Sequence, residues 1–263
     1  MGSVIASLSG IRAEVGDTLT PDLVLSWAQA FGTFIGKGPV IIGGDTRVSY
    51  ELCKYAAFSG FLATGTEIIY IGNVPTPTVQ QAIQKHHAAG GFILTASHNP
   101  IQWNGVKLMN DTGSFLNQEE FDQVNAIRTN QTYDLKPYTD LGKITQDDTA
   151  LTWHIDKILR LIDPHAIRKS SLKVLVDANH GVGAIATPQL LDRLGVEYDV
   201  LFPEPTGVFN HDPEPSKINL VKLMETMQKG GYDIGFAQDA DADRLVIVDE
   251  KGNFIGEDYS LAL

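Results

Sequence analysis

An apolar strand that runs directly into a polar loop decides the expected fold: Gly91-Phe92-Ile93-Leu94-Thr95-Ala96-Ser97-His98-Asn99-Pro100. The loop cannot continue as a helix, because the residue before a proline is held out of the helical region. In α/β proteins, active sites lie at the carboxyl ends of strands, where Ser97 stands. On position alone, an ordinary turn serine is the simpler interpretation. The glycines of G-x-S-x-G are absent around Ser97, and we expect adjacent His98 to be poorly placed as its base, so the loop does not predict a serine hydrolase.

Helices and strands alternate on both sides of this stretch. Helices are predicted to begin at Thr20, Ser49 and Thr76, because each is followed by apolar residues at helical spacing. Asn117, with Glu120 three residues later, predicts a capping box for one more helix. Further strands are expected at 40–42, 67–71 and 106–109. Strands separated by helices of about a dozen residues imply βαβ units and largely parallel sheets.

A polar, turn-rich segment at 130–148 separates two such series, and we place a domain boundary there. The second series has three expected helices, at 151–162, ending at Leu194-Gly195, and at 218–229. Its expected strands lie at 173–177, 197–201, 232–237 and 245–248. We therefore expect an α/β fold of two consecutive three-layer α/β/α domains with mixed, largely parallel sheets, at residues 1–140 and 145–263. The chain ends at 260–263 inside a new predicted helix, which suggests a truncation.

Composition limits the range of functions. The net charge of −12 argues against a nucleic-acid-binding protein, because duplex binding needs a basic face, whereas a few cations in one cleft can still bind a sugar phosphate. No apolar run approaches the roughly 20 residues that span a bilayer, and no basic segment precedes the first apolar residues, as it would in a signal peptide. The single cysteine, Cys53, excludes an internal disulfide and a cysteine-based zinc site. We expect a cytoplasmic protein without a membrane partner, and the oligomeric state is left open.

The strongest chemical signal is a loop of alternating aspartates between two apolar strands, Asp239-Ala240-Asp241-Ala242-Asp243-Arg244. Carboxylates this close repel one another unless a cation lies between them, and hard oxygen ligands favour Mg²⁺ or Ca²⁺ over zinc. An EF-hand needs glycine at the sixth position and flanking helices, but Arg244 and strands occupy these places. A solvated acidic turn is the simpler alternative. We expect Asp239, Asp241 and Asp243 to bind Mg²⁺, and Arg244 to bind a phosphate or to brace a carboxylate.

A rival function of another class comes from the segment that follows the strand at 173–177, Gly181-Val182-Gly183-Ala184-Ile185-Ala186. It matches the G-x-G-x-x-[GA] fingerprint, with Glu197 and Asp199 downstream as candidate ribose ligands, so a dinucleotide-binding oxidoreductase must be considered. The first glycine does not follow the strand immediately, and such a site has no use for the aspartate loop. We expect instead that the glycines form a tight strand-to-helix turn at a phosphate-facing edge.

Six short motifs follow one another along nearly the whole chain: Ser9-Gly10-Ile11-Arg12, Gly44-Asp45-Thr46-Arg47-Val48-Ser49, Gly72-Asn73-Val74-Pro75-Thr76-Pro77, Thr95 to Pro100, Asn104-Gly105-Val106-Lys107 and Asp239 to Arg244. Together and in this order they resemble the α-D-phosphohexomutase superfamily, which includes phosphoglucomutases, phosphomannomutases and phosphoglucosamine mutases. Two positions depart from the family pattern. Ala13-Glu14 stands where Gly-Thr is usual, and Ala240 stands where the metal loop usually has glycine, so we expect Ala240 to adopt backbone angles that favour glycine.

The resemblance implies a phosphohexose mutase, an isomerase of the intramolecular phosphotransferase type. In such an enzyme Ser97 carries a phosphoryl group and also joins the aspartates as a Mg²⁺ ligand. The phosphoryl group passes to a hexose monophosphate, and the hexose 1,6-bisphosphate that forms is the intermediate and activator. Arg12 and Lys107 become candidates for contacting the phosphoserine and for proton transfer, and His98 for steadying the loop or a phosphate. Arg47 is expected to be structural.

The substrate is suggested by Gln102-Trp103-Asn104 and by the N-terminal segment, which look most like bacterial phosphoglucosamine mutases. These enzymes interconvert glucosamine 6-phosphate and glucosamine 1-phosphate, and phosphomannomutase or phosphoglucomutase is the alternative within the family. The resemblance implies a four-domain family whose sugar-specificity and main phosphate-binding loops lie in the last two domains, and we expect these 263 residues to hold only the first two. The isolated chain is therefore expected to act as a module that binds Mg²⁺ and phosphate, with at most feeble turnover.

Overall fold

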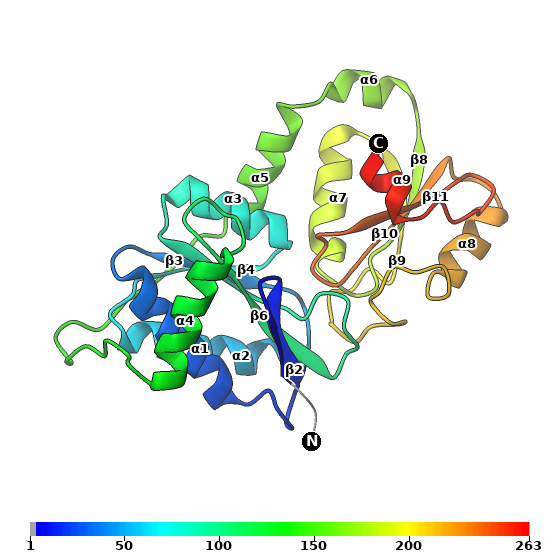
Figure 1. Cartoon of the computed structure of the whole chain (residues 1–263). Coiled ribbons are helices and arrows are strands. Elements are labelled where there is room, and N and C mark those ends of the chain that lie inside the picture. The colour runs from blue at the N-terminus through cyan, green and yellow to red at the C-terminus, as the bar shows by residue number, and fades with distance from the viewer. Residues whose placement is uncertain (1–3, 263) are drawn as a thin grey trace. The chain divides into compact units, whose positions relative to one another are not determined.

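The computed structural model describes residues 4–262, which form two compact units (Figure 1). Residues 1–3, in the N-terminal segment, and Leu263, in the predicted last helix, lie outside the described residues. The second unit contains the chain from Leu151 onward together with two short segments, Asp45–Arg47 and Ser97–Ile101. The remaining residues make up the first unit, so the predicted serine loop is part of the second.

The described residues of the first unit form a seven-stranded mixed sheet. Its strands are β1 (Ile5–Ser7), β2 (Gly10–Glu14), β3 (Val40–Gly44), β4 (Ile68–Asn73), β5 (Gly90–Leu94), β6 (Trp103–Met109) and β7 (Ile144–Gln146). They lie in the order β1-β2-β6-β5-β3-β4-β7. Strands β5, β3, β4 and β7 run parallel, whereas β6, β2 and β1 are each antiparallel to their neighbours.

The first unit extends to Ala150, past the boundary that we expected between residues 140 and 145. The reason is β7, whose residues Ile144–Gln146 pair in parallel with β4 at the edge of the first sheet. All three residues of β7 are exposed, so the strand has no apolar pattern that the sequence could reveal.

Helices cover both faces of the first sheet. Helices α1 (Pro21–Ile35), α2 (Tyr50–Ala63) and α4 (Gln118–Asn130) lie on one face and α3 (Thr76–His86) on the other, as Figure 1 shows. Successive side chains of a strand point to opposite faces. In β3, Val40 and Ile42 therefore join the core with Phe31 of α1, whereas Gly43 lies against Val79 of α3.

Three of the four predicted helix starts, at Thr20, Ser49 and Asn117, are confirmed, although Ser49 makes no capping bond, and the fourth is shifted by one residue. Oγ1 of Thr20 accepts the amide of Leu23 at the start of α1, and Asn117 and Glu120 form the predicted capping box of α4. Ser49 precedes α2 without capping it, because its hydroxyl oxygen accepts instead from Nδ2 of Asn104. Thr76, which we predicted as the cap of the third helix, is instead its first residue, and Pro75 occupies the cap position.

The described residues of the second unit form a four-stranded mixed sheet in the order β11-β10-β8-β9. Its strands are β8 (Lys173–Asp177), β9 (Glu197–Leu201), β10 (Ile234–Gln238) and β11 (Leu245–Val248). The helices of this part of the chain are α5 (Ala150–Leu159), α6 (Pro164–Lys169), α7 (Gly183–Leu194), α8 (Val221–Gln228) and α9 (Glu257–Ala262). Strands β10, β8 and β9 run parallel and β11 is antiparallel. The short helix α6 was not predicted.

Alternating side chains of β8 divide the second unit into two cores. Val174 and Val176 pack with Leu191 of α7, whereas Leu175 packs with Leu223 of α8. Helices therefore cover both faces of this sheet as well, and the prediction of α/β/α units with mixed, largely parallel sheets is confirmed. Across residues 4–262, no helix has both the length and the apolar character that crossing a bilayer requires.

Candidate active site

The second unit brings the predicted nucleophile into contact with the predicted metal loop. Ser97 follows the end of β5, and Asp239 follows the end of β10, so both stand where α/β sheets place their active sites. The Oγ atom of Ser97 donates a hydrogen bond to Oδ2 of Asp239 over 2.9 Å. Both residues are buried, with exposed fractions of 3% and 1%. The two motifs that the sequence offered separately thus form one site.

Arg47 holds the serine loop in place. Its buried guanidinium donates to the backbone carbonyl oxygens of Ser97, Asn99 and Pro100 over 2.7, 2.6 and 2.8 Å. It also donates to Oδ2 of Asp45 over 3.1 Å. These bonds stabilise Ser97 at a φ of +50°, a left-handed conformation that costs a non-glycine residue roughly 1–2 kcal/mol. The contacts agree with the structural role expected for Arg47.

His98 lies closer to Ser97 than we expected. Its Nδ1 atom is 3.4 Å from Oγ of Ser97, which is near the long limit of a hydrogen bond. In an extended strand successive side chains point to opposite sides, but the left-handed backbone at Ser97 removes this alternation. The Nε2 atom of His98 lies 3.7 Å from Oε2 of Glu214. Because the shorter bond of Ser97 goes to Asp239, we keep for His98 the role of steadying the loop.

Asp239, Asp241 and Asp243 form a compact group of carboxylates. Each offers an oxygen within 4.8 Å of the others; the first two residues are buried and Asp243 is exposed. Burial, and then repulsion from Asp241 and Asp243, raises the pKa of Asp239 well above its usual range. Opposite ligands of an octahedral Mg²⁺ lie about 4.2 Å apart, so small side-chain movements would let this set bind one ion. The all-oxygen donor set fits Mg²⁺ and does not fit zinc.

The backbone of the metal loop differs from the expectation at one position. Its positive φ, +51°, falls on Ala242, and Ala240 is not among the described residues that have a positive φ. The prediction that Ala240 adopts angles favouring glycine is therefore wrong. The carbonyl oxygen of Ala240 accepts from the amide of Val182 over 3.1 Å, and this bond fixes the local backbone.

The glycines of the dinucleotide fingerprint pack against the same loop. A Cβ atom on Gly181 would lie 2.9 Å from the carbonyl oxygen of Ala240, and one on Gly183 would lie 2.5 Å from Oε1 of Gln238. The first contact is to backbone and is too short for a real Cβ atom, so the close approach of the metal loop requires glycine at position 181. The second is to the end of a flexible side chain, which a Cβ atom on Gly183 would displace. Packing thus accounts for Gly181 of the fingerprint without a bound nucleotide.

Arg244 braces the first carboxylate of the metal loop. Its backbone amide donates to Oδ1 of Asp239 over 3.2 Å, and its Nε donates to Oδ2 over 3.3 Å. Its Nη atoms bond both carboxylate oxygens of Glu214 over 2.9 and 3.2 Å, and Nη1 lies 3.3 Å from Oε1 of Glu257. Burial opposes the charge of the guanidinium, but the hydrogen bond to Glu214 and the nearby carboxylates outweigh it and raise the pKa of Arg244. Of its two expected roles, these contacts support the bracing one.

Sequence reasoning missed Glu214 and the residues that hold its loop. Nε2 of His211 lies 3.2 Å from Oδ2 of Asp177. Oδ1 of Asn179 accepts the amides of Asn210 and His211 over 2.8 and 3.2 Å. These bonds attach the loop to the carboxyl end of β8. The available signal was the length of the proline-rich segment 202–215, since long loops in compact domains are usually functional.

Arg12 and Lys107 belong to the first unit, where they lie beside each other. Arg12 pairs with Gly105 across β2 and β6, so Lys107 occupies a diagonal position on the same face of the sheet. A Cβ atom on Gly10 would lie 3.4 Å from Cγ of Lys107 and 3.6 Å from Nε of Arg12. Lys107 is buried, with an exposed fraction of 2%. Two cationic side chains are thus held together, and their contact with a phosphoserine at Ser97 stays a proposal.

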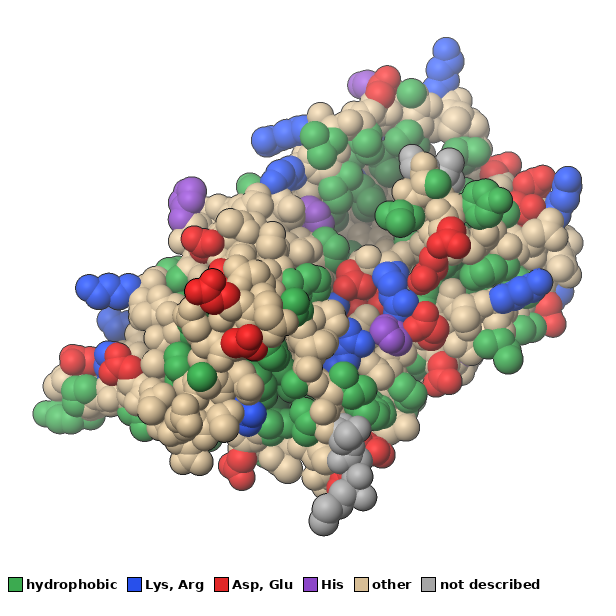
Figure 2. All heavy atoms as spheres, in the orientation of Figure 1, with side chains coloured by type: hydrophobic (Ala, Val, Ile, Leu, Met, Phe, Trp, Pro, Cys, Tyr) green, Lys and Arg blue, Asp and Glu red, His purple; other side chains and the backbone are tan. Residues whose placement is uncertain are grey.

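A depression of about 380 Å³ borders the metal loop in the second unit. It is lined by Asp243, Arg244 and Leu245 on one side and by residues of α9 on the other. Figure 2 shows hydrophobic and acidic side chains gathered beside α9. The exposed ligand candidate Asp243 therefore opens onto a space that solutes can enter.

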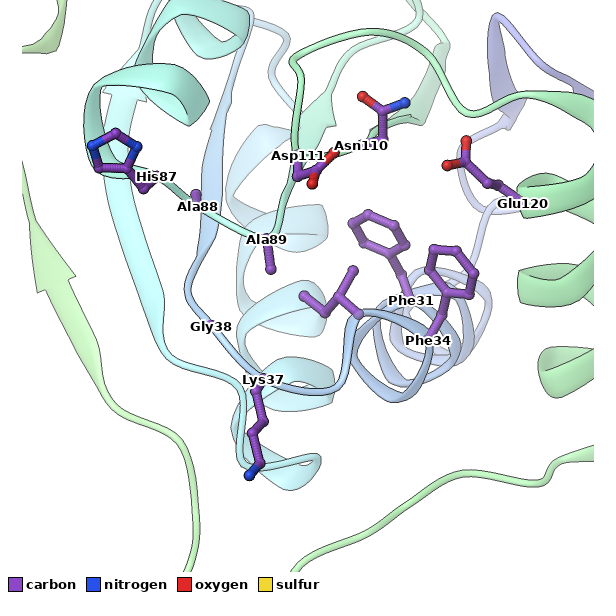
Figure 3. Close-up of a pocket in the computed structure, with 11 residues that line it drawn as sticks. Phe31, Phe34, Lys37, Gly38, His87, Ala88, Ala89, Asn110, Asp111 and Glu120 are labelled. Atoms are coloured by element: carbon purple, nitrogen blue, oxygen red, sulfur yellow. The ribbon is translucent and has the colours of Figure 1, made fainter.

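A larger depression of about 470 Å³ lies in the first unit, away from the predicted residues. Figure 3 shows the rings of Phe31 and Phe34 on one side of it and Asn110 and Asp111 on another. It adjoins the amino ends of β3 and β5, preceded by Gly38 and Ala89. Because α/β sites form at carboxyl ends, we do not assign the chemistry to this depression.

Two family models match the chain, one in each half of the sequence. The model described as "Phosphoglucomutase/phosphomannomutase, alpha/beta/alpha domain I" matches residues 5–134, and the corresponding domain II model matches residues 153–252. The chain belongs to the phosphoglucomutase/phosphomannomutase family. The predicted membership of the phosphohexomutase superfamily is confirmed, with the serine loop in the first matched region and the aspartate loop in the second.

Individual relatives agree with this membership. The chain is 36% identical to a "Phosphoglucomutase/phosphomannomutase" of Thermococcus kodakarensis, over 100% of this chain and 59% of that protein. It is 38% identical to a "Probable phosphoglucosamine mutase" of Pyrococcus horikoshii, over 97% of this chain and 55% of that protein. A solved phosphoglucomutase/phosphomannomutase family protein from Burkholderia thailandensis is similar with a TM-score of 0.80 and 26% identity, over 95% of this chain and 57% of that chain. The chain therefore spans somewhat more than half the length of these relatives.

Proposed function

We propose that this chain carries the nucleophile and the metal site of a phosphohexose mutase, which moves a phosphoryl group between the 6 and 1 positions of a hexosamine or hexose phosphate. The observation that carries the proposal is the hydrogen bond from Oγ of Ser97 to Oδ2 of Asp239. It joins a hydroxyl group at a strand end to a carboxylate group suited to Mg²⁺. Membership of the phosphoglucomutase/phosphomannomutase family supports the same reaction.

In the proposed reaction Ser97 is phosphorylated at Oγ. The bond between phosphorus and Oγ breaks while a new bond forms from phosphorus to the free sugar hydroxyl, and the proton of that hydroxyl passes to a base. The product is a 1,6-bisphosphate, and Oγ regains a proton. The intermediate then presents its other phosphate, and the same step in reverse rephosphorylates Ser97. When bound, Mg²⁺ supplies charge neutralisation at the phosphoryl group.

The remaining site residues have the roles that their positions suit. Lys107 and Arg12 are the proposed partners of the phosphoryl group and of the transferred proton, because they are adjacent cations on one sheet face. His98 is proposed to steady the serine loop, and Arg244 to hold Asp239 through two hydrogen bonds.

The proposed substrate is glucosamine phosphate. The Pyrococcus horikoshii relative named "Probable phosphoglucosamine mutase" supports this choice. The Thermococcus kodakarensis relative named "Phosphoglucomutase/phosphomannomutase" keeps glucose and mannose phosphates as alternatives within the same reaction.

The test is intact-mass measurement after incubation with Mg²⁺ and either glucosamine or glucose 1,6-bisphosphate. We expect the chain to gain the mass of one phosphoryl group, and peptide mapping to place it on Ser97. The Ser97→Ala variant should gain nothing, whereas Ser114→Ala, an exposed serine of the first unit, should react like the wild type. The absence of any adduct on Ser97 with both bisphosphates would contradict the proposal.

A further inference from the structure

Glu214 contacts both loops of the candidate site. Its two carboxylate oxygens accept from the Nη atoms of Arg244 over 2.9 and 3.2 Å, in the paired geometry that arginine and carboxylate form best. Its Oε2 atom also lies 3.7 Å from Nε2 of His98. Arg244 follows the last aspartate of the metal loop, and His98 follows the nucleophile. One carboxylate therefore lies next to both chemical motifs without belonging to either.

The backbone of Glu214 is fixed by its own loop. The residue stands between two buried prolines, Pro213 and Pro215, and a residue before a proline is confined to extended conformations. Its carbonyl oxygen accepts from the amide of Ser216 over 2.7 Å and from Nδ2 of Asn219 over 2.8 Å. The carboxylate is thus held where Arg244 can meet it, so little further conformational entropy is lost when the pair forms.

The guanidinium of Arg244 is itself a cation that three close aspartates attract. It carries five N–H donors in a planar fork, and it already donates to Oδ2 of Asp239 through Nε. In the structure its Nη atoms are bonded to Glu214, with a further contact from Nη1 to Glu257. Released from Glu214, the same donors are available to the carboxylates of the metal loop, whose mutual repulsion any nearby cation relieves.

We propose that Glu214 is a positioning residue of the metal site: it binds the guanidinium of Arg244 so that the arginine braces Asp239 without occupying the cation position among the three aspartates. The inference rests on the metal site of the proposed function. It assigns to Glu214 a role in keeping that site open for a metal ion, because the arginine and the metal compete for the same oxygens.

The test is the dissociation constant of Mn²⁺, which prefers the same oxygen ligands as Mg²⁺ and whose free form is measured by electron paramagnetic resonance. Glu214→Asp keeps the charge but shortens the side chain, and Glu214→Gln keeps the shape but removes the charge. We expect each to weaken Mn²⁺ binding at least about tenfold, the usual effect of losing a residue that orients a metal ligand. Glu257→Gln is the matched control, because it removes the other carboxylate charge that contacts the Arg244 guanidinium, at a single distance of 3.3 Å. We expect this variant to weaken Mn²⁺ binding at most about threefold.

A double variant separates competition from loss of charge. If Arg244 takes the metal's place when Glu214 is absent, Arg244→Gln should raise Mn²⁺ affinity more in the Glu214→Gln background than in the wild type. A simple charge effect predicts the same rise in both backgrounds, because it adds independently of Glu214.

Four results would overturn the inference alone. They are wild-type affinity in Glu214→Asp, equal losses in Glu214→Gln and Glu257→Gln, an equal effect of Arg244→Gln in the wild-type and Glu214→Gln backgrounds, and a metal-free Glu214→Gln variant that is already unfolded without urea. If the wild type binds no Mn²⁺, or if Asp241→Asn binds it equally well, the metal site of the proposed function fails and this inference fails with it.

Discussion

Ser97 donates its hydroxyl hydrogen to Oδ2 of Asp239 over 2.9 Å, and the same oxygen accepts from Nε of Arg244 over 3.3 Å. One buried carboxylate thus contacts the proposed nucleophile and the bracing arginine, and it is also one of three proposed metal ligands. Asp243, at the other end of the same loop, is exposed. The two aspartates therefore have different surroundings, although the sequence presents them as equivalent.

We expect Asp239→Asn to impair phosphorylation of Ser97 by a hexose 1,6-bisphosphate more strongly than Asp243→Asn does. The first variant loses a metal ligand together with the carboxylate that receives the serine hydroxyl, whereas the second loses a ligand alone. We expect losses in rate of roughly 100-fold or more and roughly tenfold, respectively. The measurement is the time course of the intact-mass change at fixed Mg²⁺. Equal rates in the two variants would show that the contact between Ser97 and Asp239 has no part in the reaction.

Arg47→Lys is expected to lower the free energy of unfolding by about 3 kcal/mol. Arg47 donates to three carbonyl oxygens of the serine loop and to Asp45, and a lysine cannot reach all of these acceptors from one buried nitrogen. Urea unfolding followed by circular dichroism measures the change. Arg160→Lys, at an exposed position, should stay within about 0.5 kcal/mol of the wild type. If Arg47→Lys also changed the free energy of unfolding by less than about 0.5 kcal/mol, the serine loop would not depend on the arginine for its conformation.

Ser97 and the aspartate loop could be predicted because local patterns carry them. Ser97 lies in the loop after the apolar strand Gly90–Leu94, and the aspartates lie between β10 and β11, whose residues alternate in burial. Charge repulsion depends on spacing along the chain, which is visible in any sequence. The helix caps at Thr20 and Asn117 were predictable for the same reason, since a cap and its partner lie within one turn.

Glu214 and the position of the left-handed residue could not be predicted because tertiary contacts decide them. Glu214 lies 30 residues from its partner Arg244, in a loop without periodicity. The positive φ falls on Ala242 because the loop packs through Ala240 on the turn at Val182, a contact that spacing does not reveal. The three-residue strands β1 and β7 were missed because all of their residues are exposed and no apolar alternation marks them.

The pair of His211 and Asp177 is expected to make stability depend on pH. Burial disfavours the charged imidazole, but the hydrogen bond and charge of Asp177, with Asp212, outweigh it and raise the pKa of His211. Because the pKa of His211 is higher in the folded protein, the charged imidazole stabilises the fold fully when the pH is below its pKa in the unfolded chain, about 6.5. This stabilisation is lost as the pH rises through the pKa of His211 in the folded protein. The difference in free energy of unfolding between the wild type and His211→Gln should therefore shrink from about pH 5.5 to about pH 8.5.

Urea unfolding at several pH values measures this difference. The same substitution in an Asp177→Asn background is the control, since the partner that raises the pKa is then neutral, and the pH dependence should be much smaller. A difference between wild type and His211→Gln that grows with pH would contradict the assignment of a charged imidazole to this contact.

Glycine at the two alanine positions of the metal loop is expected to have opposite effects on stability. Ala242 has a φ of +51°, where a Cβ atom is unfavourable, so Ala242→Gly should raise the free energy of unfolding by up to about 1 kcal/mol. Ala240 is 2% exposed, so Ala240→Gly removes a buried methyl group and adds backbone freedom to the unfolded chain, and it should lower the same free energy by about 1 kcal/mol. Urea midpoints of the two variants, measured without metal, compare the effects directly. A gain of stability in Ala242→Gly can come only from relief of the backbone conformation, because the substitution removes a methyl group and frees the unfolded chain; a loss of stability in both variants would contradict the left-handed placement of Ala242.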